Sequence, residues 1–184
     1  MGTSREKLDE RDLSVLAGLL RIRHAIDDEL ATLIGRPPTS GGIGEVVAAA
    51  VLDIDLAATG VMPGYDGRFV SGPLAQQSVN VKAYAERGSL LDIGPHQCDW
   101  YLVLMGPPRE SSHRGRSLPF RVASVYLFKT EDLVATLKTA GVGIGIATSL
   151  RKAIWEAAEI YPVARSSNLV LTEDQKRLLG LFAK

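Results

Sequence analysis

The chain has 184 residues, 46% of them hydrophobic and 23% charged, and its 21 lysines and arginines match its 21 aspartates and glutamates. This length and composition exclude a disordered chain and allow one domain with a core of its own. A net charge of zero excludes the overall basic character of a dedicated nucleic-acid binder, so contacts with phosphates must be local.

Redox and targeting features predict a cytoplasmic protein. Cys98 is the chain's one cysteine, so no disulfide forms within it. The sequence carries no signal peptide and no apolar run of about 18 residues, the length expected of a membrane span. We therefore expect a reducing compartment and no membrane partner.

A long amphipathic helix is predicted near the N-terminus. The polar residues 1–11 lead into apolar residues at steps of three and four positions, and Gly35 with Pro37-Pro38 ends the pattern. The members of the stripe are Leu13, Leu16, Leu20, Ile26, Leu30 and Leu33. Residues 1–36 are expected to form a helical arm, and residues 37–184 an α/β domain. The arm is also a candidate for docking a partner.

The next predicted elements are a helix and a hairpin. Residues 43–56 show a helical pattern of small apolar residues that begins near Gly44, with Glu45 in the first turn. Two strands follow, over residues 65–70 and 79–84, and the Gly/Pro-rich segment between them predicts an antiparallel pair.

The second half of the chain alternates strands with helices. The unbroken apolar run at 100–105 predicts a strand buried on both faces in the middle of a sheet. A strand at 121–128 precedes a helix at 131–139, for which Thr130 is the expected N-cap and Gly141 the stop.

Three short elements complete the predicted fold. These are a strand over 142–147, a helix over 150–160 capped by Thr148 or Ser149, and a last helix to Phe182 opened by a capping box of Thr172 with Gln175. The fold class is therefore α/β, with a mixed central sheet flanked by helices.

Four polar residues in the first half of the domain predict a metal site. Hard ions such as Mg²⁺ prefer oxygen ligands, and Glu45 and Asp66 supply carboxylates. On the strand at 79–84 the period of two sends Asn80 and Lys82 to one face, near Asp66 if the hairpin forms. The plain alternative is a polar strand end in which Lys82 forms a salt bridge with Asp66.

In this order, Glu45, Tyr65-Asp66-Gly67-Arg68 and Asn80-Val81-Lys82 resemble the PD-(D/E)XK nuclease superfamily. Gly-Glu on the helix and Val-Asn-Val-Lys on the strand are also similar to uncharacterised bacterial domain families. The resemblance spans residues 42–105, including the strand that Asp99 opens, and implies a restriction-endonuclease-like fold.

The resemblance implies Mg²⁺- or Mn²⁺-dependent cleavage of phosphodiester bonds in DNA, of restriction or defence type. Asp66 would be the principal metal ligand, with Asn80 replacing the usual second acid and the Val81 carbonyl beside it. Glu45 would bind the metal or its water, and Lys82 would position the attacking water. The enzyme would act alone or as a homodimer that cuts both strands. The alternative is a degenerate module that binds DNA or protein without cutting it.

Further arginines are candidates for DNA contacts. Arg109, Arg114 and Arg116 lie in a loop with a local positive excess, and Arg68 lies in the hairpin. A solvated loop is the alternative, and His113 in this loop has no evident partner. Cys98 next to the buried strand is expected to be an inert thiol rather than a zinc ligand with His96.

Overall fold

The structure is a computed structural model in which the chain separates into two compact units, Met1–Pro38 and Thr39–Lys184. It describes residues 9–58, 64–94, 98–108 and 118–183. The first unit contains α1 (Glu10–Ile34), which begins earlier than its apolar stripe because Asp9 and Asp12 form a capping box. Gly35 ends the helix in the left-handed conformation, as predicted.

The second unit begins with α2 (Ser40–Leu52), which Thr39 caps, so this helix starts before Gly44. It also ends earlier than predicted, because Asp53 adopts the left-handed conformation. The residues that follow form β1 (Ile54–Leu56), so the prediction of a helix to Leu56 was wrong. Ile54 is buried in either case, and apolar periodicity over so few residues does not separate a last helical turn from a strand.

A mixed six-stranded sheet forms the centre of this unit, in the order β1-β2-β3-β5-β6-β8. Its other strands are β2 (Gly67–Phe69), β3 (Ser78–Tyr84), β5 (Trp100–Met105), β6 (Ser124–Lys129) and β8 (Glu159–Tyr161). A short 3-10 helix, η1 (Gly72–Leu74), connects β2 to β3. Strands β3 and β5 are parallel, and all other neighbours are antiparallel. The predicted antiparallel hairpin and the buried central strand are both confirmed.

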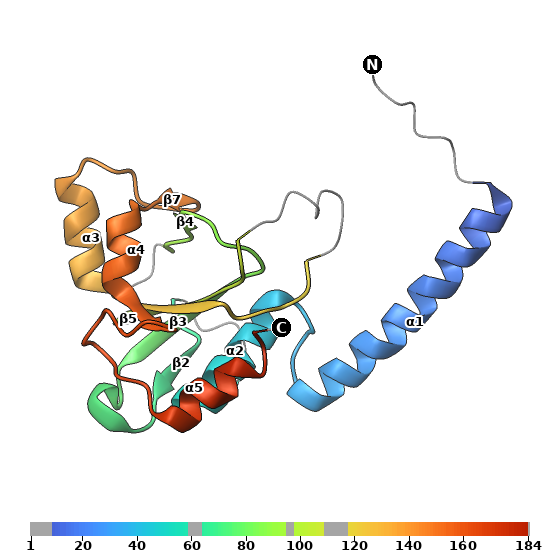
Figure 1. Cartoon of the computed structure of the whole chain (residues 1–184), viewed down its shortest axis with the longest axis horizontal. Helices are drawn as coiled ribbons and strands as arrows, with labels where there is room; N and C mark the ends of the chain where they lie inside the picture. The colour runs from blue at the N-terminus through green and yellow to red at the C-terminus, as the bar shows by residue number, and fades with distance from the viewer. Residues whose placement is uncertain (1–8, 59–63, 95–97, 109–117, 184) are drawn as a thin grey trace, which may run out of the picture. The chain divides into compact units, whose positions relative to one another are not determined.

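Helices cover both faces of the sheet (Figure 1). On one face, the α2 face, Val47 of α2 and Leu179 of α5 (Glu173–Gly180) share a core with Leu102 of β5. On the other, the α4 face, α3 (Thr130–Thr139) and α4 (Lys152–Ala158) pack with Tyr101 and Tyr126. None of the described helices is both long and apolar enough to cross a membrane.

The structure corrects two predictions beside α3. Lys129 occupies the N-cap position of α3 without a side-chain bond, so Thr130 is not the cap. Residues 142–147 do not form the expected strand. Residues 145–147 make a turn instead, at which the Thr148 hydroxyl bonds both the N–H and the carbonyl of Gly145. The strand there is β7 (Thr148–Ser149), which pairs with β4 (Leu90–Leu91) in a separate two-stranded sheet.

The C-terminal elements include a strand that the sequence did not predict. Helix α4 ends before residue 160, and Ile160 belongs to β8, which pairs with β6 at the edge of the sheet. Neither Thr148 nor Ser149 caps α4, since its N-cap position is Arg151. The predicted capping box of Thr172 with Gln175 is confirmed at the start of α5.

Two glycines allow close approaches that shape the region around β3. A Cβ on Gly44 would lie 2.5 Å from the Cβ of Ala83, so α2 rests directly on the end of β3 at the start of its second turn. A Cβ on Gly67 would lie 2.5 Å from the Asp55 carbonyl oxygen. Glycine at this position lets β1 approach β2 beside Asp66.

Candidate functional site

The sequence-predicted residues meet at the edge of β3. Strand β2 pairs with β3 only at Ser78 and Val79. Beyond that point the Asp66 carboxylate extends the ladder, because its Oδ2 accepts a hydrogen bond of 2.7 Å from the Val81 N–H. The N–H and the carbonyl of a strand residue point to the same side, so the Val81 carbonyl also faces this edge. We call Asp66, Asn80, Val81 and Lys82 the β3-edge site.

Two polar side chains of β3 project from the α4 face. Asn80 pairs with Tyr101, and Lys82 pairs with Val103, whose side chains lie in the core of that face. The Asn80 Oδ1 atom is buried and has no hydrogen-bond partner in the part of the chain that the structure describes. Lys82 is half-buried, and no hydrogen bond or ion pair joins its ammonium to a described residue. Two side chains that normally seek partners are therefore unsatisfied on adjacent positions of one face.

The charge of Asp66 reaches the same face. Burial raises the pKa of Tyr101 to about 12, and the neighbouring Cys98 sulfur and the Asp66 carboxylate add to this increase. The Tyr101 hydroxyl accepts a hydrogen bond of 3.2 Å from the Gly94 N–H. The Asp66 carboxylate thus lies at the edge of the sheet and within electrostatic range of the α4 face.

The plain structural alternative made Lys82 the salt-bridge partner of Asp66. No ion pair joins these two described residues. The Asp66 carboxylate instead bonds the backbone of Val81. The ammonium of Lys82 is therefore available for a ligand.

Glu45 lies in a different layer from Asn80 and Lys82. It lies in the second turn of α2 and not in the first as predicted, because the helix already begins at Ser40, and it is half-buried. Its neighbour Gly44 contacts Ala83, so Glu45 stands at the level of the last residues of β3. The structure thus brings Asp66, Asn80 and Lys82 to one stretch of β3 and places Glu45 across the sheet.

The oxygen atoms of the β3-edge site match the donors that Mg²⁺ or Mn²⁺ prefers. They are one carboxylate from Asp66, one amide oxygen from Asn80 and the peptide carbonyl of Val81. Within the described residues, no three His, Cys, Asp or Glu side chains converge on one point. The buried, unpartnered Asn80 Oδ1 is the atom whose hydrogen-bonding capacity a cation would satisfy.

The predicted DNA contacts are only partly described. Arg68 is exposed, its Nη1 donates a hydrogen bond of 2.8 Å to the Gln76 carbonyl, and its guanidinium lies 5.0 Å from the centre of the Tyr65 ring. These contacts already hold Arg68 in the hairpin. Arg109, Arg114 and Arg116, together with His113 and His96, lie outside the described residues.

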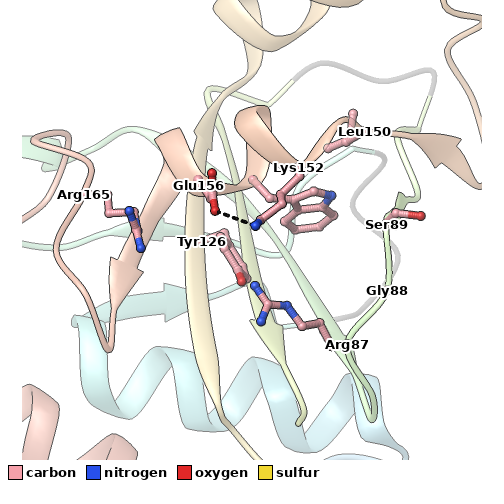
Figure 2. A pocket seen from close by; sticks show the side chains of 9 residues that line it. Arg87, Gly88, Ser89, Tyr126, Leu150, Lys152, Glu156 and Arg165 are labelled. Atoms are coloured by element: carbon pink, nitrogen blue, oxygen red, sulfur yellow. Dashed lines mark ion pairs between the residues drawn. The ribbon is translucent and has the colours of Figure 1, made fainter. Parts of the chain in front are cut away.

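A basic cavity of about 410 Å³ opens on the α4 face and was not predicted (Figure 2). Lys152 lies 3.4 Å from Glu156, and Arg165 lies 2.8 Å from Glu159, so these two cations are paired. Arg87 extends towards Tyr126 in Figure 2, and its guanidinium bonds no described residue. Side chains from the segment after β3, from β6, from α4 and from the segment after β8 line it: Arg87, Tyr126, Lys152, Glu156 and Arg165.

This cavity and the β3-edge site share one row of the sheet. Lys82 pairs with Val103, and Val103 pairs with Tyr126 on the next strand. Two strand spacings amount to about 10 Å. The sequence could not reveal the cavity, because Arg87, Lys152 and Arg165 come from separate segments that only the tertiary structure joins.

At the opposite end of β3, polar groups are fully bonded. Asp99 Oδ2 accepts hydrogen bonds of 2.7 Å from both the N–H and the hydroxyl of Ser78, and these bonds lower the pKa of Asp99. Burial raises the pKa of the Cys98 thiol, which donates to the Trp100 carbonyl at 3.1 Å. A buried thiol with a raised pKa is a poor nucleophile.

No protein-family model matches the chain, and no curated protein is significantly similar to it. The assignment of a function therefore depends on the geometry of the β3-edge site and of the basic cavity.

Proposed function

We propose that this protein is a metal-dependent endonuclease that cleaves phosphodiester bonds in DNA at the β3-edge site. One observation carries the proposal. The Asp66 carboxylate bonds the backbone of Val81 at an unpaired strand edge, while the adjacent Asn80 oxygen and Lys82 ammonium have no bonding partner among the described residues. An anion, a neutral oxygen donor and a free cation in this order suit a metal ion beside a phosphate.

Asp66, the Asn80 side-chain oxygen and the Val81 carbonyl would hold Mg²⁺ or Mn²⁺, and Glu45 would add a carboxylate from the far layer. When bound, such an ion lowers the pKa of a coordinated water and polarises a phosphoryl oxygen. The residues of the chain fix the position of that centre, because Asp66 is anchored by its hydrogen bond to Val81.

Lys82 supplies the positive charge of the reaction. Its ammonium projects from β3 two positions after Asn80 and is not neutralised by Asp66. In the proposed role it orients the attacking water and stabilises the negative charge that develops on the phosphoryl oxygens. An ammonium already committed to a salt bridge would serve neither purpose as well.

The arrangement of elements supports a restriction-endonuclease-like fold. The order helix α2, hairpin β2–β3 and buried strand β5 is the order on which the resemblance to the PD-(D/E)XK superfamily rests. In that comparison Asn80 stands where a second acid is usual. The proposal therefore assigns the site one carboxylate from the hairpin instead of two.

The basic cavity supports DNA as the substrate. Arg87, whose guanidinium bonds none of the described residues, comes from the segment after β3, and Tyr126 in the lining of the cavity lies about 10 Å from Lys82 across two strands. Arginine is a common phosphate ligand, because its guanidinium can bond two phosphate oxygens at once. A neighbouring phosphate bound here would fix the register of the scissile one.

The test is cleavage of plasmid DNA by the purified chain in Mg²⁺, in Mn²⁺ and in EDTA. We expect cleavage only with metal, and we expect Lys82→Ala to reduce it at least 100-fold, because one preorganised charge contributes about 10²- to 10³-fold to such reactions. Lys138→Ala is the matched control, since Lys138 is exposed in the last turn of α3. Plasmid that stays intact under all conditions, or equal cleavage by Lys82→Ala, would contradict the proposal.

The second candidate is a module that binds DNA without cutting it. The neutral amide of Asn80 at the place of an acid favours this reading, because it reduces the charge available to hold a divalent ion. In that case wild-type protein retards DNA in gels and never nicks it. Arg87→Ala would weaken retardation and its dependence on salt, whereas Lys82→Ala would leave both unchanged.

A further inference from the structure

The surface of α1 is unusually apolar for a helix that buries none of its residues. Leu33 is 82% exposed, Ile22 60% and Leu19 58%. The exposed large apolar side chains of this helix are Leu13, Val15, Leu16, Leu19, Leu20, Ile22, Ile26 and Leu33. Contiguous apolar surface of this kind marks an interaction site.

Part of this surface is organised as a single stripe. Val15, Leu19, Ile22, Ile26 and Leu33 recur at spacings of three, four or seven positions, which places them on one side of the helix. A groove of about 550 Å³ follows the C-terminal half of the stripe, lined by Ile22, Ala25, Ile26, Glu29, Leu30 and Leu33. Such a stripe is the pattern of a helix that pairs with another helix.

We propose that α1 pairs in antiparallel orientation with α1 of a second copy of this chain. The charge pattern identifies the occupant. The basic residues Arg21, Arg23 and His24 are followed by the acidic residues Asp27, Asp28 and Glu29. Parallel copies in register would place acid beside acid and base beside base. Antiparallel copies centred between residues 24 and 25 place each acidic segment beside the basic segment of the other copy.

The same centre aligns the apolar stripe. Leu19 comes to the level of Leu30 of the second copy, and Ile22 lies within one residue of the level of its Ile26. Near the ends of the pair, Val15 lies within one residue of the level of the second copy's Leu33. Arg23 and Asp27, which already form an ion pair of 3.4 Å within the helix, lie within one residue of the level of the second copy's Asp27 and Arg23, respectively. One register thus satisfies both the apolar and the charged positions.

The resulting dimer has a two-fold axis across the helix pair, so the same surface is used on both copies. It carries two copies of the β3-edge site, but the pairing does not depend on what that site does. Failure of the nuclease proposal would leave this inference intact, and failure of this inference would leave the nuclease proposal intact.

The first test is the mass of the full chain in solution, measured by light scattering over a range of concentrations. We expect the wild type to have twice the mass of the monomer and Ile26→Asp to have the monomer mass. Ala17→Asp is the matched control, because Ala17 is exposed on the opposite side of α1, about two and a half turns from Ile26. A monomeric wild type, or a dimeric Ile26→Asp, would overturn the proposal.

The second test measures the relative orientation of the two α1 helices and does not require a variant that disrupts the dimer. Val15→Cys and Leu33→Cys are purified separately with different tags, then mixed and oxidised. Antiparallel pairing predicts a disulfide between the two variants and none within either one, since like positions would be roughly 27 Å apart along the axis. The wild-type chain, in which the buried Cys98 is the one cysteine, is the control for crosslinking through that thiol. Crosslinking of either variant with itself would overturn the antiparallel arrangement.

Discussion

The two ends of β3 differ in how their polar groups are satisfied. At the start of the strand, Ser78 and Asp99 bond each other at 2.7 Å, and the Trp100 Nε1 donates to Gln77 Oε1 at 2.5 Å. From Asn80 onwards the pattern changes, because the Asn80 Oδ1 is buried without a partner and the Lys82 ammonium bonds no described residue.

This difference separates polar residues that support the fold from those available to a ligand. A buried hydrogen-bond acceptor without a partner lowers the free energy of unfolding by about 1–3 kcal/mol. Folding by itself gives no reason to keep such a group. The first residues of β3 show that this sheet can bond its polar side chains internally. The unsatisfied groups a few positions later therefore mark the place where we assign chemistry.

Of the substitutions that test the difference between the two ends of β3, we expect Asp66→Asn to have the largest effect on cleavage. Asp66→Asn keeps a side-chain oxygen for the Val81 N–H and removes the charge. We expect at least a 100-fold loss of metal-dependent plasmid cleavage with little change in the midpoint of thermal unfolding. Asp99→Asn, the same substitution at the satisfied end, should leave cleavage unchanged. Equal effects of the two variants on cleavage would remove the distinction between the two ends.

A smaller effect is expected on stability at the start of β3. Asp99→Ala removes two acceptor bonds and should lower the free energy of unfolding by about 1–2 kcal/mol at pH 7. The pKa of Asp99 is lowered in the folded state, so its contribution is complete above the ordinary value of 3.8 and is lost as the pH falls through the folded pKa. Denaturant titrations should therefore show the gap between wild type and variant shrinking below about pH 4. A gap that grows in acid would contradict the assigned role.

The smallest predicted effect concerns metal affinity. Asn80→Asp adds a carboxylate beside Asp66, so it should lower the unfolding midpoint without metal and raise the affinity for Mg²⁺ about tenfold. Thermal unfolding with and without Mg²⁺ measures both effects. Asn168→Asp, at an exposed position, is the control. A Mg²⁺-independent midpoint in Asn80→Asp would argue that no cation binds at the β3 edge.

Local signals in the sequence predicted much of the fold. Gly35 ended α1, and Thr172 with Gln175 opened α5, because caps depend on residues three or four positions apart. The apolar run at 100–105 identified the central strand for a similar reason, since burial on both faces leaves a continuous pattern. The hairpin that carries Asp66 and Asn80 followed from alternation and turn residues.

Short edge elements and the basic cavity depended on the tertiary structure. Ile54 and Ile160 are buried whether they end a helix or form a strand, and the pairing of β1 with β2 and of β8 with β6 decides the matter. Arg87 and Tyr126 line one cavity because β3, β5 and β6 are neighbours in the sheet. The sequence determined the helix ends and central strands through contacts between near neighbours. The pairing of the edge strands and the grouping of distant charged residues depend on contacts between residues far apart in the chain. Only the tertiary structure determines these contacts.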